Sequence, residues 1–204
     1  RLDAPIAEKG ISSTHVTGYG SPKLNGLGLS IRADSTNLGF LQPFIEGIFS
    51  EINGRVNGNV RLYGDFKHLD LEGEVRAKMD AKIDVLNTYF QIRDDSIHIS
   101  SGSLDFRNVK VYDREGHDGL VNGYLHHTKL KNLMYHFNIR GNNLLMYNTY
   151  EAGNMPFYGK VYGTGNVVLD GGNNAMTVDA SLTTGNNTSF TYITGVTAPS
   201  LSIP

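Results

Sequence analysis

The sequence contains no cysteine and no tryptophan, and neither sign of charge dominates it. Without cysteine, a disulfide framework and a thiolate metal site are both excluded. The 18 basic and 20 acidic residues give a net charge of -2, with no block of like charge that would follow a phosphate backbone. Nucleic acid is therefore not an expected partner.

Long apolar runs are also missing. No stretch of about 18 apolar residues occurs, so we expect no transmembrane helix in this segment. The first residue, Arg1, shows neither an initiator Met nor a signal peptide, and we expect a segment of a longer protein. What the sequence does hold is 24 Gly, 11 Tyr and 39% hydrophobic residues. This composition suits short strands, tight turns and a packed core, and it predicts a mostly β fold.

The most regular segment runs from Leu69 to Val85. Apolar or small residues occupy the odd positions, and every even position from Asp70 to Asp84 is charged. A strand would place all these charges on one solvent-exposed face, whereas a helix would distribute them around most of its circumference. We therefore expect a strand, with a bend or turn near Met79 to Ala81 because the segment exceeds a usual strand length.

Shorter alternating runs follow, separated by polar turns that bear Gly or Asn. This pattern predicts a meander of strands with one wet and one dry face, as in a rolled sheet, sandwich, barrel or solenoid. Gly58-x-Val60-x-Leu62-x-Gly64 recurs as Gly165-x-Val167-x-Leu169-x-Gly171, which favours an elongated form. The expected strands are Gly54–Gly64, Tyr89–Arg93, Ser96–Ile99, Leu104–Tyr112, Leu120–His126, Leu133–Gly141, Lys160–Leu169 and Met176–Leu182.

One segment departs from this pattern. Between Leu41 and Ile52 the apolar residues recur at spacings of three and four, which predicts a short amphipathic helix with Pro43 in its first turn. The expected organisation is an amino-terminal strand and loop segment at 1–36, the helix at 37–53, a β domain at 54–190 and an irregular tail at 191–204.

Motifs for catalysis or metal binding are weak. His126 and His127 are adjacent, so a strand would point them to opposite faces and away from a shared ion. The turn from Asp113 to Gly119 lacks the ligand spacing of an EF-hand and is better explained as a hairpin loop. No nucleotide loop or serine nucleophile elbow occurs. We therefore expect no enzyme activity, no catalytic residue, no metal site and no cofactor.

The inward positions of the expected strands form a set of apolar residues. From periodicity alone, a closed core explains them better than an open groove. The candidate groove residues are Val56, Val60, Leu62, Leu69, Leu71, Val75, Leu104, Phe106, Phe137, Ile139, Val167 and Leu169.

Several stretches, in this order and spacing, resemble the carboxy-terminal region of the TamB family, the inner-membrane component of the translocation and assembly module. The resemblance covers roughly 38–190. Its stretches are Leu41–Phe49, Gly54–Gly58, Leu69–Glu74, Val85–Phe90, Phe106–Val109, Tyr112–Asp113, Leu145–Thr149, Phe157–Gly165 and Thr183–Thr184.

This resemblance implies a fold and a function. The fold is an elongated antiparallel sheet, rolled into a taco-like or solenoid-like groove, with one short helix. The function is non-catalytic phospholipid transport between the membranes of a Gram-negative cell envelope, or outer-membrane protein assembly and secretion. The segment would lie in the periplasm, with an inner-membrane anchor elsewhere in the protein.

The implied partners are phospholipid acyl chains or outer-membrane protein strands. An outer-membrane barrel is a further implied partner, although the tail beyond Thr191 departs from the terminal strands expected for docking to it. Two alternatives stay open. One is a carbohydrate- or surface-binding β-sandwich of a secreted or surface protein, suggested by the many Tyr and Asn residues. The other is a transmembrane barrel, for which the expected helix has no natural place.

Overall fold

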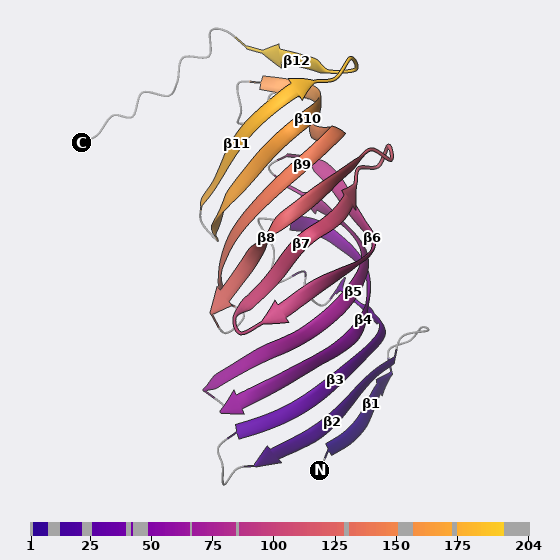
Figure 1. Ribbon diagram of the computed structural model, residues 1–204, viewed down its shortest axis with the longest axis vertical. Coiled ribbons are helices and arrows are strands. Elements are labelled where there is room, and N and C mark those ends of the chain that lie inside the picture. The colour runs from indigo at the N-terminus through magenta and orange to yellow at the C-terminus, as the bar shows by residue number, and fades with distance from the viewer. Residues whose placement is uncertain are drawn as a thin grey trace, which may run out of the picture.

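The computed structural model describes residues 2–7, 13–21, 26–39, 42, 49–65, 67–84, 86–128, 131–150, 157–172 and 175–193. Within these residues the chain forms a single antiparallel sheet, whose strands stack along the long axis of the molecule (Figure 1). The strands are β1 (Leu2–Ala7), β2 (Ser13–Ser21), β3 (Gly26–Asn37), β4 (Phe49–Asp65), β5 (His68–Ile83), β6 (Thr88–Ser100), β7 (Ser103–Tyr112), β8 (Asp118–Thr128), β9 (Lys131–Thr149), β10 (Phe157–Gly172), β11 (Ala175–Thr184) and β12 (Ser189–Tyr192).

The topology is a meander. Each strand from β1 to β11 pairs with its neighbours in the sequence, and β12 pairs with the start of β10. Among the described residues β1 pairs only with β2 and β11 only with β10, so the sheet is open rather than closed into a barrel. The expected mostly β fold, an elongated rolled antiparallel sheet, is confirmed.

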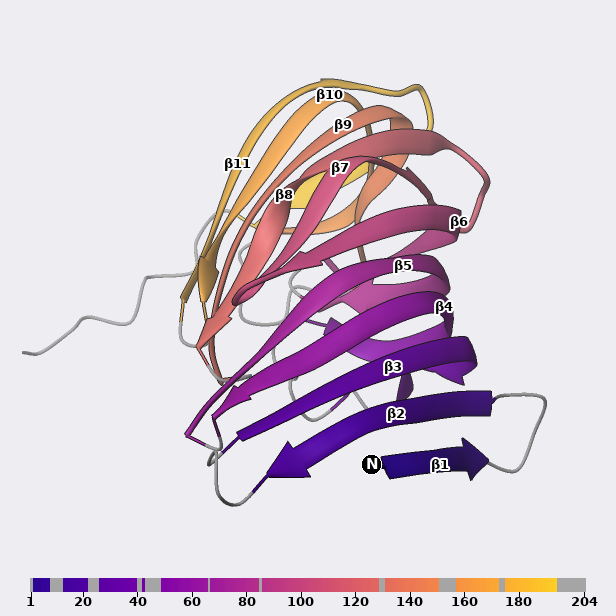
Figure 2. The ribbon, with the colours of Figure 1, turned by 60° about the horizontal axis from the view of Figure 1, so that its bottom comes forward.

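The strands curve around a common inner face (Figure 2). Shifts of register interrupt several strand pairs, and a residue with positive φ lies at each of four of them: Ser35, Glu51, Asn108 and Asn143. Such β-bulges bend a strand and increase its twist, because one strand carries an extra residue. The bulges therefore explain why this long sheet rolls instead of staying flat.

The prediction of a helix between Leu41 and Ile52 is wrong at the carboxy-terminal end of that segment. Phe49 to Ile52 are the first residues of β4, and Phe49 and Ser50 pair with the end of β5. Positions 40, 41 and 43–48 lie outside the described residues. Sheet pairing continues directly from β3 to β4, across the boundaries expected near residues 36 and 53.

The other differences concern strand length. No turn divides the segment at Met79 to Ala81, since β5 is one strand of 16 residues with a shifted register between Ala77 and Met79. Asn57-Gly58 lies inside β4, as its alternation predicts. The strands β1 and β2 were not expected from the weak alternation at the start of the sequence.

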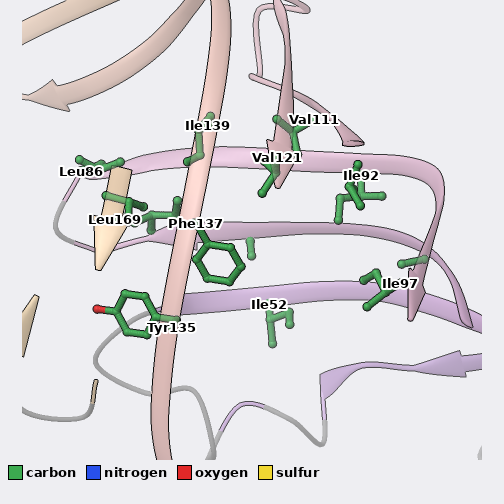
Figure 3. Packing of buried hydrophobic residues seen from close by; sticks show 14 of the residues in the cluster. Ile52, Leu86, Ile92, Ile97, Val111, Val121, Tyr135, Phe137, Ile139 and Leu169 are labelled. Atoms are coloured by element: carbon green, nitrogen blue, oxygen red, sulfur yellow. The ribbon is translucent and has the colours of Figure 1, made fainter. Parts of the chain in front are cut away.

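The core lies between the inner surfaces of the rolled sheet. Figure 3 shows side chains from β4, β6, β8, β9 and β10 directed into the same interior. Among the described residues no helix is long and apolar enough to cross a membrane. The buried cluster consists of Leu38, Ile52, Val75, Ala77, Ala81, Ile83, Leu86, Ile92, Ile97, Val109, Val111, Val121, Leu133, Tyr135, Phe137, Ile139, Leu144, Met146, Val167 and Leu169.

Candidate functional site

The twelve candidate groove residues all lie on the inner face of the sheet. Directly paired residues of neighbouring strands share a face, and the pairs Leu62 with Leu71 and Phe137 with Leu169 link members of the set. The outward neighbours are polar, as the even positions of β5 illustrate. Glu74, Arg76 and Lys78 are exposed there. The expected separation into a dry and a wet face is therefore present.

Burial divides these twelve residues into three groups. Val75, Phe137, Ile139, Val167 and Leu169 belong to the closed core. Four others are partly buried and pack against that core: Val56, Val60, Leu104 and Phe106. The remaining three lie outside the core cluster and keep solvent contact: Leu62, Leu69 and Leu71. Only part of the inner face is therefore available to a ligand.

In β4 and β5 the available part lies toward one end of the strand. Along β5 the exposed fraction is 0% at Ala77, 8% at Val75 and 37% at Leu69. The same trend occurs in β4, where Ile52 is buried and Leu62 is half-buried. The inner face of these two strands is thus packed at one end and accessible at the other.

An unbroken line of paired residues crosses the inner face of the sheet from β2 to β11. We call this line the apolar row. Tyr135 is buried, and the other members are half-buried. No charged residue interrupts it. From β2 to β11 its members are Val16, Ile31, Val60, Gly73, Ile99, Leu104, Leu125, Tyr135, Gly171 and Met176.

The apolar row follows the long axis of the molecule, because the strands stack along that axis (Figure 1). Neighbouring strands lie about 4.8 Å apart, so a row that crosses ten strands is roughly 40 Å long. Sequence reasoning found two of its members, Val60 and Leu104. It missed the others because the row is defined by the pairing of strands, which one-strand periodicity does not reveal.

Several charges on the outer face form ion pairs. Arg61 lies 3.0 Å from Glu72, and Arg76 lies 2.9 Å from Asp94. The hydrogen bonds from Arg76 hold the pKa of Asp94 below its ordinary value. These ion pairs lie on the solvent-exposed face of the sheet. The apolar row on the inner face contains no charged residue.

The loop between β7 and β8 confirms the expected hairpin at residues 113 to 117. Its Asp113 carboxylate is buried and accepts hydrogen bonds from the backbone N–H groups of Glu115, His117 and Leu145. Burial acts to raise the pKa of Asp113, but the bonds from Leu145 and His117 outweigh it and lower the pKa. This arrangement ties the hairpin to β9 and has a structural purpose.

The histidine pair is split between the two faces. His126 is exposed and stacks on Tyr124 with ring centroids 4.1 Å apart, whereas His127 is half-buried. Burial is the largest cause that lowers the pKa of His127. In the described part of the chain no three His, Asp or Glu side chains gather as a metal site would require. Gly163-Thr164-Gly165 has part of the glycine spacing of a nucleotide-binding loop. It lies inside β10 and not at a turn that leads into a helix.

A scan against protein-family models, a search of curated proteins and a search of solved structures each find no match to this chain.

Proposed function

We propose that this chain is a periplasmic segment of a TamB-like envelope protein, which acts without catalysis in phospholipid transport between membranes or in outer-membrane protein assembly and secretion. The observation that carries the proposal is the apolar row, which crosses ten strands without a charged residue. Acyl chains or unfolded outer-membrane strands would lie along it.

The dimensions of the row support a lipid ligand. The hydrocarbon core of a bilayer, which two acyl chains span end to end, is about 30 Å thick. The row, at roughly 40 Å, is therefore longer than one acyl chain. Contact along it would bury apolar surface at about 25 cal/mol per Å², and it would need no specific polar group.

The alternative function, a carbohydrate- or surface-binding module, rests on a sandwich of two sheets. The described strands form one continuous sheet instead. The exposed ring of Tyr124 stacks on His126 and His136 on the outer face, but these three rings are a small platform for a sugar. We therefore give preference to the envelope function.

Photocrosslinking in Gram-negative cells tests the proposal. A photoreactive amino acid is placed at the accessible inner positions Leu62 and Leu71, and at their outward neighbours Arg61 and Glu72 as matched controls. Val167, which is only 3% exposed, serves as the control for a buried inner position. We expect lipid or outer-membrane protein to be captured at Leu62 and Leu71 alone.

The outcomes separate the two interpretations of the inner face. Capture at both inner positions and at neither outward position would support the proposal and would identify the cargo. Equal capture from both faces, or no capture at Leu62 and Leu71, would contradict the proposal and leave the inner face with a structural role alone.

A further inference from the structure

The outer face of the sheet carries a hollow over β2, β3, β4 and β5, on the side opposite to the apolar row. It has a volume of about 630 Å³. This size lies in the range of about 300–1,000 Å³ that is typical of small-molecule sites. Seven of its ten lining residues have polar or charged side chains, whereas the candidate groove residues of the inner face are all apolar. The lining residues are His15, Thr17, Ser30, Ile31, Arg32, Asn59, Val60, Arg61, Glu72 and Gly73.

The register of the strands explains the shape of the hollow. The backbone of Ile31, Val60 and Gly73 forms its floor, because the side chain positions of this line belong to the inner face. Two lines of outward side chains form its walls. One wall is Thr17, Ser30, Arg61 and Glu72, and the other is His15, Arg32 and Asn59.

The two walls bring a pair of guanidinium groups to opposite sides of the floor. Positions two residues apart on a strand are separated by roughly 7 Å. Arg61 is held in place, since its Nη1 donates to Glu72 at 3.0 Å and its guanidinium lies 5.1 Å from the centre of the Tyr63 ring. The side chain of Arg32 makes no hydrogen bond or ion pair within the described part of the chain.

The charge of the lining is positive. Two arginines and one glutamate leave a charge of +1. Arginine donates in a planar fork that matches the oxygens of a phosphate. The hydroxyls of Thr17 and Ser30 and the amide of Asn59 can bond to hydroxyl groups beside such an anion.

We propose that this hollow binds a phosphate group carried on a hydroxyl-bearing molecule, with Arg32 and Arg61 donating to the phosphate oxygens from opposite walls. Such a phosphate occurs in soluble sugar or glycerol phosphates and in lipid headgroups. The site lies on the outer face, so it does not depend on the function proposed for the apolar row.

A titration followed by nuclear magnetic resonance tests this site. Glycerol phosphate is added to the labelled protein at constant ionic strength, with sodium chloride as the reference, and the side-chain Nε–Hε signals of arginine are recorded. We expect saturable shifts at Arg32 and Arg61 but not at Arg55, which is exposed on the same face of β4 and lies outside the hollow.

Two matched variants complete the test. Arg32→Gln should weaken binding about tenfold or more, and Arg55→Gln less than about twofold, both with an unchanged midpoint of unfolding. Equal weakening by the two variants, or shifts that do not saturate, would overturn the proposal.

Vesicles then distinguish the source of the phosphate. Sedimentation of the protein with phosphatidylglycerol vesicles that is lost in Arg32→Gln would support a lipid headgroup as the ligand. Binding of glycerol phosphate without sedimentation would support a soluble one. Neither result depends on capture of cargo at Leu62 and Leu71, so the two proposals fail separately.

Discussion

Glycine at position 73 is required both by its backbone conformation and by a close approach of the neighbouring strand. Its φ is +151°, and a Cβ there would lie 2.2 Å from the carbonyl oxygen of Asn59. We expect Gly73→Ala to lower the free energy of unfolding by about 2–3 kcal/mol, because strain and a backbone clash add. Urea denaturation measures the loss.

Gly116 provides the matched control for this substitution. It also has a positive φ, of +93°, but a Cβ there would meet nothing within 4 Å. Gly116→Ala should therefore cost only about 1 kcal/mol of strain. Equal losses in the two variants would mean that the approach of Asn59 does not matter.

The buried carboxylate of Asp113 makes stability depend on pH. Its pKa is lowered by folding, so its contribution is present above the unfolded pKa of about 3.9 and is lost as pH falls through the folded value. Asp113→Asn should lower the free energy of unfolding by about 1.5–3 kcal/mol at pH 7, since it weakens charge-assisted hydrogen bonds.

Urea denaturation at pH 7 and at pH 3 measures this effect. The difference between Asp113→Asn and the unsubstituted protein should shrink at the lower pH. Asp118→Asn is the control, because Asp118 pairs with Lys110 at the surface and should change stability little. A difference that stays constant with pH would contradict the charge as its cause.

At the scale of the strand, a bulge needs a residue that tolerates positive φ. Asn108 has a φ of +53° within β7, and its N–H donates to Oδ1 of Asn122 on β8 at 2.8 Å. Asn108→Val should cost about 1–2 kcal/mol, since a β-branched side chain is strained there, whereas Asn108→Gly should stay within about 1 kcal/mol.

Thermal or urea unfolding of both variants tests the bulge. Arg107→Val is the control, because Arg107 is the adjacent exposed residue and has no positive φ. If Arg107→Val destabilised the protein as much as Asn108→Val, the loss would come from the exposed valine and not from the bulge.

Bulges also explain which strands the sequence predicts and which it does not. Within regular strands the period of two held, and the expected runs lie inside β5 to β11. The separate strands expected at Tyr89–Arg93 and Ser96–Ile99 are one strand, β6. Glu51 has a φ of +53°, and its bulge brings Phe49 and Ile52 to the same inner face although they are three residues apart. A spacing of three also occurs in helices, so the bulge imitated a helical pattern.

At the scale of the molecule, hydrogen bonds between β9 and the turn from β5 to β6 hold the roll. The backbone N–H of Asn148, near the end of β9, donates to the carbonyl oxygen of Leu86 at 3.1 Å, and the Asn87 amide donates to the carbonyl oxygen of Asn148. Asn87→Gly keeps the positive φ of +48° and removes the side-chain bond.

This substitution should cost about 1 kcal/mol and should speed hydrogen exchange at the end of β9. Asn132→Gly is the control, since Asn132 has a φ of +50° and its side chain makes no hydrogen bond within the described residues. Unchanged exchange at residues 144–149 in Asn87→Gly would show that the bond does not hold the roll.

The candidate site was predictable only in part. The alternation of odd and even positions along a strand identified which side chains face inward, as for Leu71, and which face outward, as for Glu72. It did not reveal that Val167 is closed into the core while Leu71 stays accessible, because that depends on how far the sheet curls. Nor did it connect Ile31, Val60 and Ile99, since their alignment requires the register of distant strands.

The meander topology has a consequence for the evolution of length. Because each strand from β1 to β11 pairs with the strands beside it in the sequence, a hairpin can be duplicated or deleted at one place without changing the register elsewhere. Each added hairpin would lengthen the apolar row by about 10 Å. Duplication of a hairpin within the gene can therefore adjust the length of such a sheet in regular steps.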